Sequence, residues 1–187
     1  MSRRFFVTGA YGFLGAWIVK TLLDRGDSVS TFELGGSTHR LDALLSNEQA
    51  AQVIHHLGDI ADSASVREAM EKSAPDRIIH LAGLQVPMCK ADPIAGAHVN
   101  VVGTLNVFEA AHALDVGPVV YASSAAVYGP APADVAIAEN EYLDPRTHYG
   151  VFKTAETNEE WVASNVSLIS VFLPKTRLEF VFPLESE

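Results

Sequence analysis

An apolar segment, a glycine-rich turn and a helix-like segment follow one another at the start of the chain, and this order restricts the fold more than any other feature. Residues 3–8 contain a short apolar run, glycines occupy positions 9, 12 and 15, and residues 16–23 repeat their apolar side chains at helical spacing. Gly26 follows as the expected C-cap. A strand, a tight turn and a helix in this order begin a crossover unit, which connects two parallel strands.

The same alternation continues along the chain. Further strands are expected at residues 28–34, 52–57, 77–82, 118–123 and 166–173. Further helices are expected at residues 37–45, opened by a Ser or Thr cap, at 63–72, headed by Ser63, and at 93–114 and 147–162. Because strands and helices alternate, we predict an α/β fold, a doubly wound, Rossmann-type parallel sheet with helices on both faces. The Pro- and Ala-rich stretch 129–146 is expected to be a functional loop.

Composition narrows the possible partners. The 187 residues suit one compact domain, and a net charge of −10 repels phosphate backbones and anionic membranes. We therefore expect neither a nucleic-acid nor a membrane partner. The single cysteine, Cys89, has no partner for an internal disulfide, and no apolar run has the length of a signal peptide core or a membrane span. A cytoplasmic protein is the expectation.

The glycine-rich turn also predicts a ligand. Glycines at a strand-to-helix turn allow a pyrophosphate to approach the backbone, and the helix N-terminus offers it free N–H groups. Glu33 ends the second expected strand, 18 residues after Gly15, where a carboxylate accepts hydrogen bonds from an adenosine ribose. No cation stands directly beside it, and Arg40 is the nearest candidate for a 2′-phosphate. The cofactor predicted is therefore NAD rather than NADP.

Further motifs occur in a fixed order after the glycine turn. They are Asp59-Ile60, the HLAG sequence at 80–83, Asn100, the YASSAAVYG sequence at 121–129, and Tyr149 followed four residues later by Lys153. Together these motifs resemble the short-chain dehydrogenase/reductase superfamily, and more narrowly its extended branch, the NAD-dependent epimerase/dehydratase family that includes UDP-galactose 4-epimerase. The likeness runs from about residue 4 to residue 171.

The resemblance implies an NAD-dependent oxidoreductase or isomerase. It implies that Tyr149 is the catalytic acid or base, that Lys153 is its partner and that Ser124 binds the substrate hydroxyl. It also implies cofactor contacts, with Asp59 and Ile60 at the adenine. The full set implied for the cofactor is Gly9, Tyr11, Gly12, Phe13, Leu14, Gly15, Glu33, Asp59, Ile60, Leu81, Ala82, Gly83, Asn100, Tyr149 and Lys153.

Elementary physics is consistent with these catalytic roles. Tyr149 and Lys153 are four residues apart and share one face of a helix. Lowering a tyrosine pKa from about 10 to about 7 requires roughly 4 kcal/mol, which one cation at about 4 Å supplies at an effective dielectric constant of about 20. Ser124 follows the fifth expected strand, at the edge where ligands of open parallel sheets bind.

The type of reaction follows from the residues after Ser124. Dehydratases of the family carry an acidic pair there, whereas this chain has Ala125 and Ala126. Dehydration is therefore disfavoured, and epimerisation or net dehydrogenation at a carbinol carbon of a nucleotide-sugar or related hydroxy compound remains. Gln85, in a segment expected to leave the fourth strand as a loop, either hydrogen-bonds the substrate or faces water.

Three expectations concern metals, assembly and the chain end. We predict no metal, because the seven histidines show no ligand spacing. The apolar helix at 93–114 is either buried in the core or forms a homodimer together with the Tyr149 helix. We expect an NAD-binding domain at residues 1–173 and a divergent tail at 174–187 in place of the family's substrate-binding lobe. The chain is then either an epimerase or dehydrogenase, or a cofactor-binding fragment without turnover.

Overall fold

One six-stranded parallel sheet forms the centre of the protein. The computed structural model describes residues 2–130, 137, 141–155 and 166–170, and the strand order is β3-β2-β1-β4-β5-β6. This arrangement confirms the predicted α/β class and all six expected strands, several of them one or two residues shorter. The strands are β1 (Arg4–Thr8), β2 (Ser28–Glu33), β3 (Ile54–Leu57), β4 (Arg77–His80), β5 (Val119–Ser123) and β6 (Val166–Ser170).

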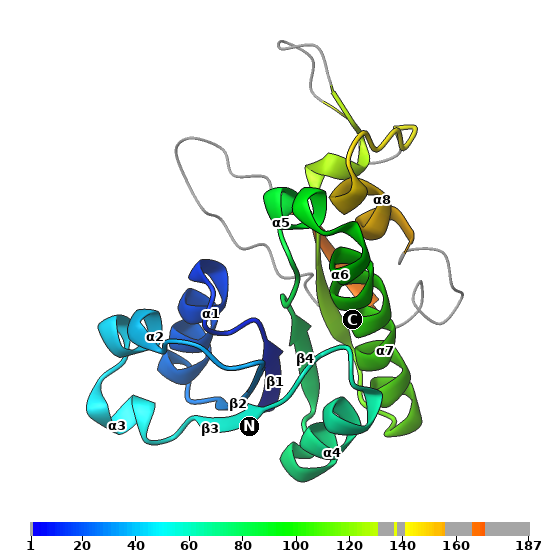
Figure 1. Ribbon diagram of the computed structural model, residues 1–187. Helices are drawn as coiled ribbons and strands as arrows, with labels where there is room; N and C mark the ends of the chain where they lie inside the picture. The colour runs from blue at the N-terminus through cyan, green and yellow to red at the C-terminus, as the bar shows by residue number, and fades with distance from the viewer. Residues whose placement is uncertain (1, 131–136, 138–140, 156–165, 171–187) are drawn as a thin grey trace.

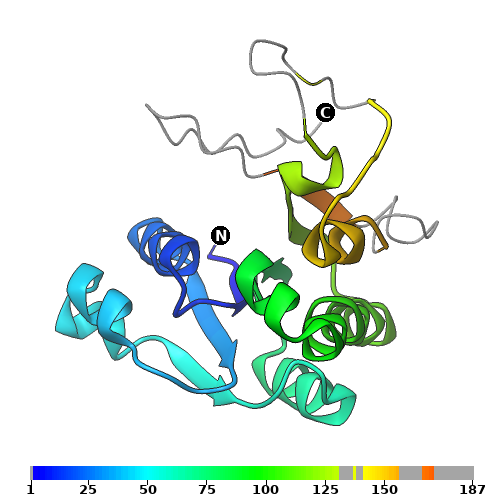
Figure 2. The same cartoon turned by 45° about the horizontal axis from the view of Figure 1, so that its top comes forward.

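Helices cover both faces of the sheet, as Figures 1 and 2 show. They are α1 (Phe13–Asp24), α2 (His39–Leu44), α3 (Asn47–Ala50), α4 (Ser63–Ser73), α5 (Val86–Ala91), α6 (Pro93–Ala97), the π-helical η1 (His98–Val102), α7 (Gly103–Ala113), the 3₁₀ turn η2 (Ala125–Val127) and α8 (His148–Ala155). The alternation of β1 explains the two layers. Phe5 and Val7 pack with the apolar residues of α1 and α2, whereas Phe6 packs with those of α4 and α7.

Several local predictions need correction. The helix expected at 37–45 ends at Leu44 and is followed by α3, which a capping box between Ser46 and Gln49 begins; the Ser-x-x-Gln spacing was a usable signal. Helix α4 begins at Ser63 as expected, but its N-cap is Asp62, whose carboxylate accepts a hydrogen bond from the backbone N–H of Ala64. The C-cap of α1 is Arg25, and Gly26 follows it at φ +81°.

Two further differences affect the predicted loop and the long helix. The segment after β4 contains α5 rather than only a loop, and a proline in the first turn of α5 was its sequence signal. The helix expected at 93–114 is divided into α6, η1 and α7, with the π-helical part centred on Asn100. Residues 156–162 of the expected last helix and 171–173 of the last strand lie outside the described residues.

The strand order places a crossover point between β1 and β4. The chain moves from β1 to β2 and β3 in one direction, returns to β4 beside β1, and continues to β5 and β6 in the other direction. In an open α/β sheet the crevice at the carboxyl ends of the two strands flanking this point is the usual ligand site. The glycine turn follows β1, and residues 81–85 follow β4, so both predicted cofactor segments lie at this edge. Within the described part of the chain, no helix is long and apolar enough to span a membrane.

Candidate active site

The glycine turn between β1 and α1 is packed tightly against the end of β4. Gly9 has φ +73°, and a Cβ atom there would lie 2.7 Å from the backbone nitrogen of Ala82. A Cβ at Gly15 would lie 2.6 Å from Cα of Ala10, inside the turn itself. Gly12 is the N-cap of α1 and offers no side chain to the first N–H groups of the helix. The turn therefore presents an uncapped helix N-terminus, which favours an anionic ligand.

Glu33 lies at this turn. Its carboxylate accepts a hydrogen bond from the backbone N–H of Tyr11 at 3.3 Å. Burial raises the pKa of Glu33 to about 7, although hydrogen bonds from the backbone of Tyr11, Ala10 and Gly9 lower it. The acid at the end of β2 and the glycines after β1 are thus brought together, as their sequence positions predict.

The side chain of Tyr11 is held between neighbouring elements. Its hydroxyl lies 3.0 Å from Nδ1 of His55, which also lies 2.9 Å from Oγ1 of Thr31. The guanidinium of Arg40 donates a hydrogen bond to the carbonyl of Tyr11 at 3.3 Å. Arg40, the nearest cation expected from the sequence, therefore lies beside the turn.

A buried histidine joins the ends of β1 and β4. Nδ1 of His80 lies 2.6 Å from Oγ1 of Thr8, and Nε2 lies 2.9 Å from Oγ1 of Thr104. Burial lowers the pKa of His80 to about 3, so the ring is neutral. Because Thr104 donates its proton to the carbonyl of Asn100, Nε2 of His80 is the donor to Thr104, and Nδ1 accepts from Thr8. Sequence reasoning missed this network, since none of its spacings differs from that of an ordinary core.

Asn100 fixes the segment after β4. It is fully buried; its Oδ1 accepts a hydrogen bond from the backbone N–H of Leu84 at 2.7 Å, and its Nδ2 donates to the carbonyl of Leu84 at 2.8 Å. Both polar groups of this side chain therefore already bind the segment that the resemblance assigns to the cofactor. Thr8 acts on the same segment, because Oγ1 accepts hydrogen bonds from the N–H groups of Leu81 and Ala82.

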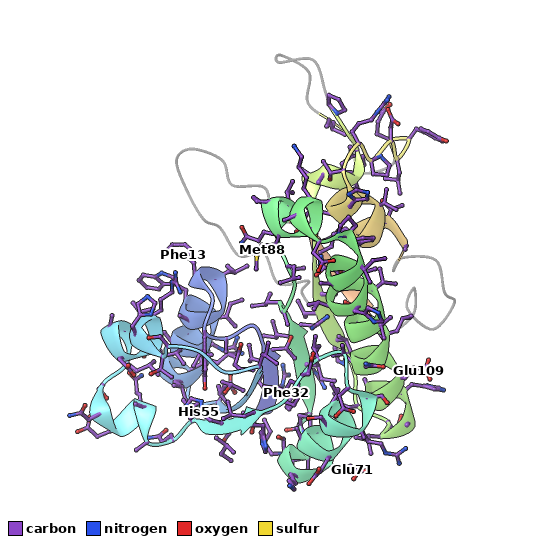
Figure 3. The ribbon with its side chains drawn as sticks, viewed as in Figure 1. Phe13, Phe32, His55, Glu71, Met88 and Glu109 are labelled. Carbon is purple, nitrogen blue, oxygen red and sulfur yellow. The ribbon has the colours of Figure 1, made fainter. Side chains whose placement is uncertain are left out.

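The remaining expected site residues divide into exposed and buried ones. Gln85 is exposed and is the N-cap of α5. Asp59 is exposed, and its carboxylate accepts a hydrogen bond from the backbone N–H of Ala61 at 2.9 Å. Ile60 belongs to the apolar core beneath α7. Phe13 is 64% exposed at the start of α1, and Figure 3 shows it together with Met88, which lies on α5.

Ser124 and Tyr149 come together from two elements. Ser124 follows β5 and is the N-cap of η2, where its hydroxyl accepts a hydrogen bond from the backbone N–H of Ala126. Tyr149 lies in the first turn of α8. A hydrogen bond with Ser124 lowers the pKa of Tyr149, but burial raises it more, so that the pKa lies above its ordinary value.

Lys153 makes its hydrogen bond to Tyr121 and faces only the ring of Tyr149. Its amine donates a hydrogen bond to the hydroxyl of Tyr121 at 2.5 Å and lies 5.9 Å from the ring centroid of Tyr149. The expected lowering of the Tyr149 pKa to about 7 is therefore not found. The main cause is burial of the Tyr149 phenol; the amine of Lys153 gives its hydrogen bond to another phenol, and burial lowers the pKa of Lys153 itself to about 8. Within the described residues, no group of three or more His, Cys, Asp or Glu side chains is placed to hold a metal ion.

Known proteins resemble this chain over its described length. UDP-glucose 4-epimerase of Mycolicibacterium smegmatis is 36% identical over 154 residues, which are 81% of this chain and 48% of that protein. A bifunctional UDP-glucose and UDP-xylose 4-epimerase of Arabidopsis thaliana is 28% identical over 156 residues, which are 80% of this chain and 44% of that protein. The chain thus spans about half the length of the curated relatives it matches.

The fold agrees with these sequence relatives. The crystal structure of Thermus thermophilus UDP-glucose 4-epimerase in complex with NAD superimposes with a TM-score of 0.78 at 28% identity, covering 89% of this chain and 53% of that one. The family model described as GDP-mannose 4,6 dehydratase matches residues 6–167. That match covers most of the chain and includes the glycine turn, Ser124, Tyr149 and Lys153. The chain is therefore a member of the GDP-mannose 4,6 dehydratase family, within the NAD-dependent epimerases and dehydratases that its motifs resemble.

Proposed function

We propose that the crevice at the carboxyl ends of β1 and β4 binds NAD, and that the chain carries the cofactor-binding half of a nucleotide-sugar epimerase. The observation that carries this proposal is Glu33 lying against the glycine turn, next to the uncapped N-terminus of α1. The helix end suits a pyrophosphate, and the carboxylate suits the two hydroxyls of an unphosphorylated ribose. A crystal structure of a similar epimerase contains NAD, which supports the same assignment.

Each site residue then has a role in binding. The turn between Gly9 and Gly15 holds the pyrophosphate, Glu33 the adenosine ribose, and Asp59 with Ile60 the adenine. Leu81, Ala82 and Gly83 line the crevice opposite the turn, and Asn100 keeps their segment in place through Leu84. The remaining proposed contacts are those of Tyr11, Gly12, Phe13, Leu14, Tyr149 and Lys153.

The proposed chemistry uses three side chains. When bound, NAD supplies a ring that accepts a hydride from a carbinol carbon and returns it. Tyr149 takes the proton of the substrate hydroxyl and gives it back, Ser124 orients that hydroxyl, and Lys153 stabilises the deprotonated phenol. Gln85, which is exposed at the start of α5, is the residue that we propose to hydrogen-bond the substrate. Since Ala125 and Ala126 supply neither acid nor base for elimination, we propose epimerisation, with dehydrogenation as the second possibility.

A second candidate function is NAD binding without turnover. The contact of Lys153 with Tyr121 favours it, because Tyr149 then has a raised pKa and is a poor base near neutral pH. Both candidates require the same cofactor site. Measuring NAD affinity and turnover of UDP-sugars on the same preparation distinguishes them, because only the epimerase interconverts the sugars.

Calorimetric titration of the 187-residue chain with NAD tests the shared site. We expect micromolar binding of NAD and weaker binding of NADP, since the carboxylate of Glu33 repels a 2′-phosphate. Glu33→Ala is expected to weaken NAD binding by about tenfold, through loss of hydrogen bonds to a charged group. Unchanged NAD affinity in a folded Glu33→Ala protein would refute the assigned adenosine end of the site.

The raised pKa of Glu33 predicts that NAD binding depends on pH. Only the ionised carboxylate accepts hydrogen bonds from both ribose hydroxyls, and with a pKa of about 7 its ionised fraction rises about tenfold between pH 6 and pH 8. NAD affinity should therefore increase with pH by up to that factor. The same titration of Glu33→Gln, whose side chain is neutral throughout, should show no such increase. A parallel pH dependence in both proteins would assign the effect to another group.

We also propose a homodimer formed by the helices that carry Asn100 and Tyr149. Val102 and Leu105 are each 39% exposed, and Val151 is 49% exposed, so both helices present apolar side chains that a second copy would cover. Leu105→Asp is expected to shift the protein to a monomer in sedimentation velocity, whereas Ile54→Asp, at a more exposed position on β3, should not. A monomeric parent chain would contradict this proposal.

We also propose a cytoplasmic location, because Cys89 is a buried free thiol.

A further inference from the structure

Tyr121 lies on β5, between β4 and the edge strand β6, and contacts Lys153 of the candidate active site. It belongs to β5, its side chain is fully buried, and its hydroxyl accepts the hydrogen bond from Lys153 at 2.5 Å. The amine of Lys153 also lies 4.2 Å from the centroid of the Tyr121 ring. The same phenol therefore offers this cation a hydrogen-bond acceptor and the electron-rich face of a ring.

The environment of Lys153 makes this contact important. The side chain is 4% exposed, and a buried ammonium group is costly unless a polar partner stabilises it. Among the residues that the structure describes, the titratable groups around the amine come from four elements. They are Tyr121 of β5, His80 of β4, Cys89 of α5 and Tyr149 of α8. His80 is neutral, and burial raises the pKa values of both Cys89 and Tyr149, so at neutral pH the ammonium depends on polar neighbours rather than on a fixed negative charge.

Packing fixes the position of the Tyr121 hydroxyl. The ring stacks on His80 with centroids 5.5 Å apart and meets Phe108 edge-on at 5.8 Å. His80 is itself held at both ring nitrogens, by Thr8 and Thr104. Thr8 precedes the glycine turn and binds His80, on which the Tyr121 ring stacks. The position of the Lys153 amine therefore depends on Thr8 through these two rings.

We propose that Tyr121 is a positioning residue, whose hydroxyl and ring face hold the ammonium group of Lys153 at the floor of the cofactor crevice. A catalytic consequence of this contact rests on the proposed function, in which Lys153 assists Tyr149. The contact itself does not depend on that function. Because of this contact, Lys153 must break its hydrogen bond to Tyr121 before its amine moves closer to Tyr149.

Tyr121→Phe tests the proposal, because it keeps the ring and removes the acceptor. The readout is the titration of the Lys153 amine, followed by NMR of the ¹⁵N-lysine-labelled chain and assigned through Lys153→Met. In the unaltered chain the amine should titrate near a pKa of about 8. In Tyr121→Phe the pKa should fall by about one unit, which corresponds to loss of a charge-assisted hydrogen bond. An unchanged pKa in the folded variant would overturn the proposal.

Two measurements complete the test. Tyr142→Phe makes the same chemical change at a side chain that is 85% exposed and should leave the Lys153 titration unchanged. If Tyr121→Phe does not fold, the unaltered chain still decides, because the amine lies 4.2 Å from the Tyr121 ring centroid, and absence of a nuclear Overhauser effect between the Lys153 side chain and the Tyr121 ring would overturn the proposal. Neither measurement uses NAD or substrate, so failure of the proposed function and failure of this inference are distinguishable.

Discussion

Replacing Tyr149 with phenylalanine is expected to reduce UDP-sugar epimerisation by the chain about 10²- to 10⁴-fold, the usual contribution of a positioned acid or base. The phenol is the group that we propose to exchange a proton with the substrate, and it hydrogen-bonds with Ser124, which follows β5. The pyrophosphate and adenosine contacts lie on other elements, so NAD affinity should change by less than about threefold. Coupled turnover assays and calorimetry on the same protein measure the two quantities.

Tyr142→Phe is the matched control for this prediction. It removes a phenolic hydroxyl from an exposed tyrosine and should leave both turnover and NAD affinity unchanged. A Tyr149→Phe protein that epimerises at the parent rate would exclude Tyr149 as the acid or base. If the parent chain binds NAD but shows no turnover, the second candidate function applies, and the Lys153 contact with Tyr121 supplies a physical explanation.

Gly15→Ala is expected to destabilise the protein and to abolish measurable NAD binding. The new Cβ atom would lie 2.6 Å from Cα and 2.9 Å from the carbonyl carbon of Ala10, and backbone atoms cannot move away as a flexible side chain does. Overpacking of this kind costs about 1–3 kcal/mol or more of unfolding free energy. Because the turn and the N-terminus of α1 must separate to accept the methyl group, the proposed pyrophosphate site changes shape. Chemical denaturation and calorimetry with NAD measure the two effects.

Gly26→Ala separates this steric clash from the loss of glycine itself. Gly26 has φ +81°, but a Cβ atom there would meet nothing within 4 Å, so only backbone strain of about 1 kcal/mol is expected. Gly26 lies at the opposite end of α1 from the turn, and NAD affinity should be retained. Equal destabilisation by the two substitutions, or NAD binding by Gly15→Ala at the parent affinity, would contradict the packing argument.

Local sequence patterns were sufficient for the sheet. Most strands contain a short apolar run, although β2 and β3 also carry several polar residues, and each main helix repeats its apolar residues with a helical period. Interactions between neighbouring residues therefore determine most of these elements. The short helices α3 and α5 were missed because four to six residues show too little periodicity. Their signals were local instead: a Ser-x-x-Gln cap before α3 and a proline in the first turn of α5.

The candidate site was only partly predictable. Local sequence patterns predict which residues gather at the carboxyl edge of the sheet, because the strand-helix alternation and the parallel order bring the glycine turn, Glu33, Ser124 and Tyr149 there. They do not determine the partners of these residues. A spacing of four residues puts Lys153 and Tyr149 on one helical face, yet the hydrogen bond of Lys153 goes to Tyr121, which is 32 residues away in the chain.

Burial and long-range contacts determine the pKa values and the hydrogen-bond partners of the site residues, and both arise only in the assembled fold. Whether a phenol is a good base depends on its desolvation and on which cation reaches it, and both are set by packing between β5, α5 and α8. In the same way, His80 is neutral and joined to Thr8 and Thr104 because three distant segments enclose it. Sequence periodicity fixes which elements form, since it acts between neighbours, whereas pKa values and hydrogen-bond partners require the assembled fold.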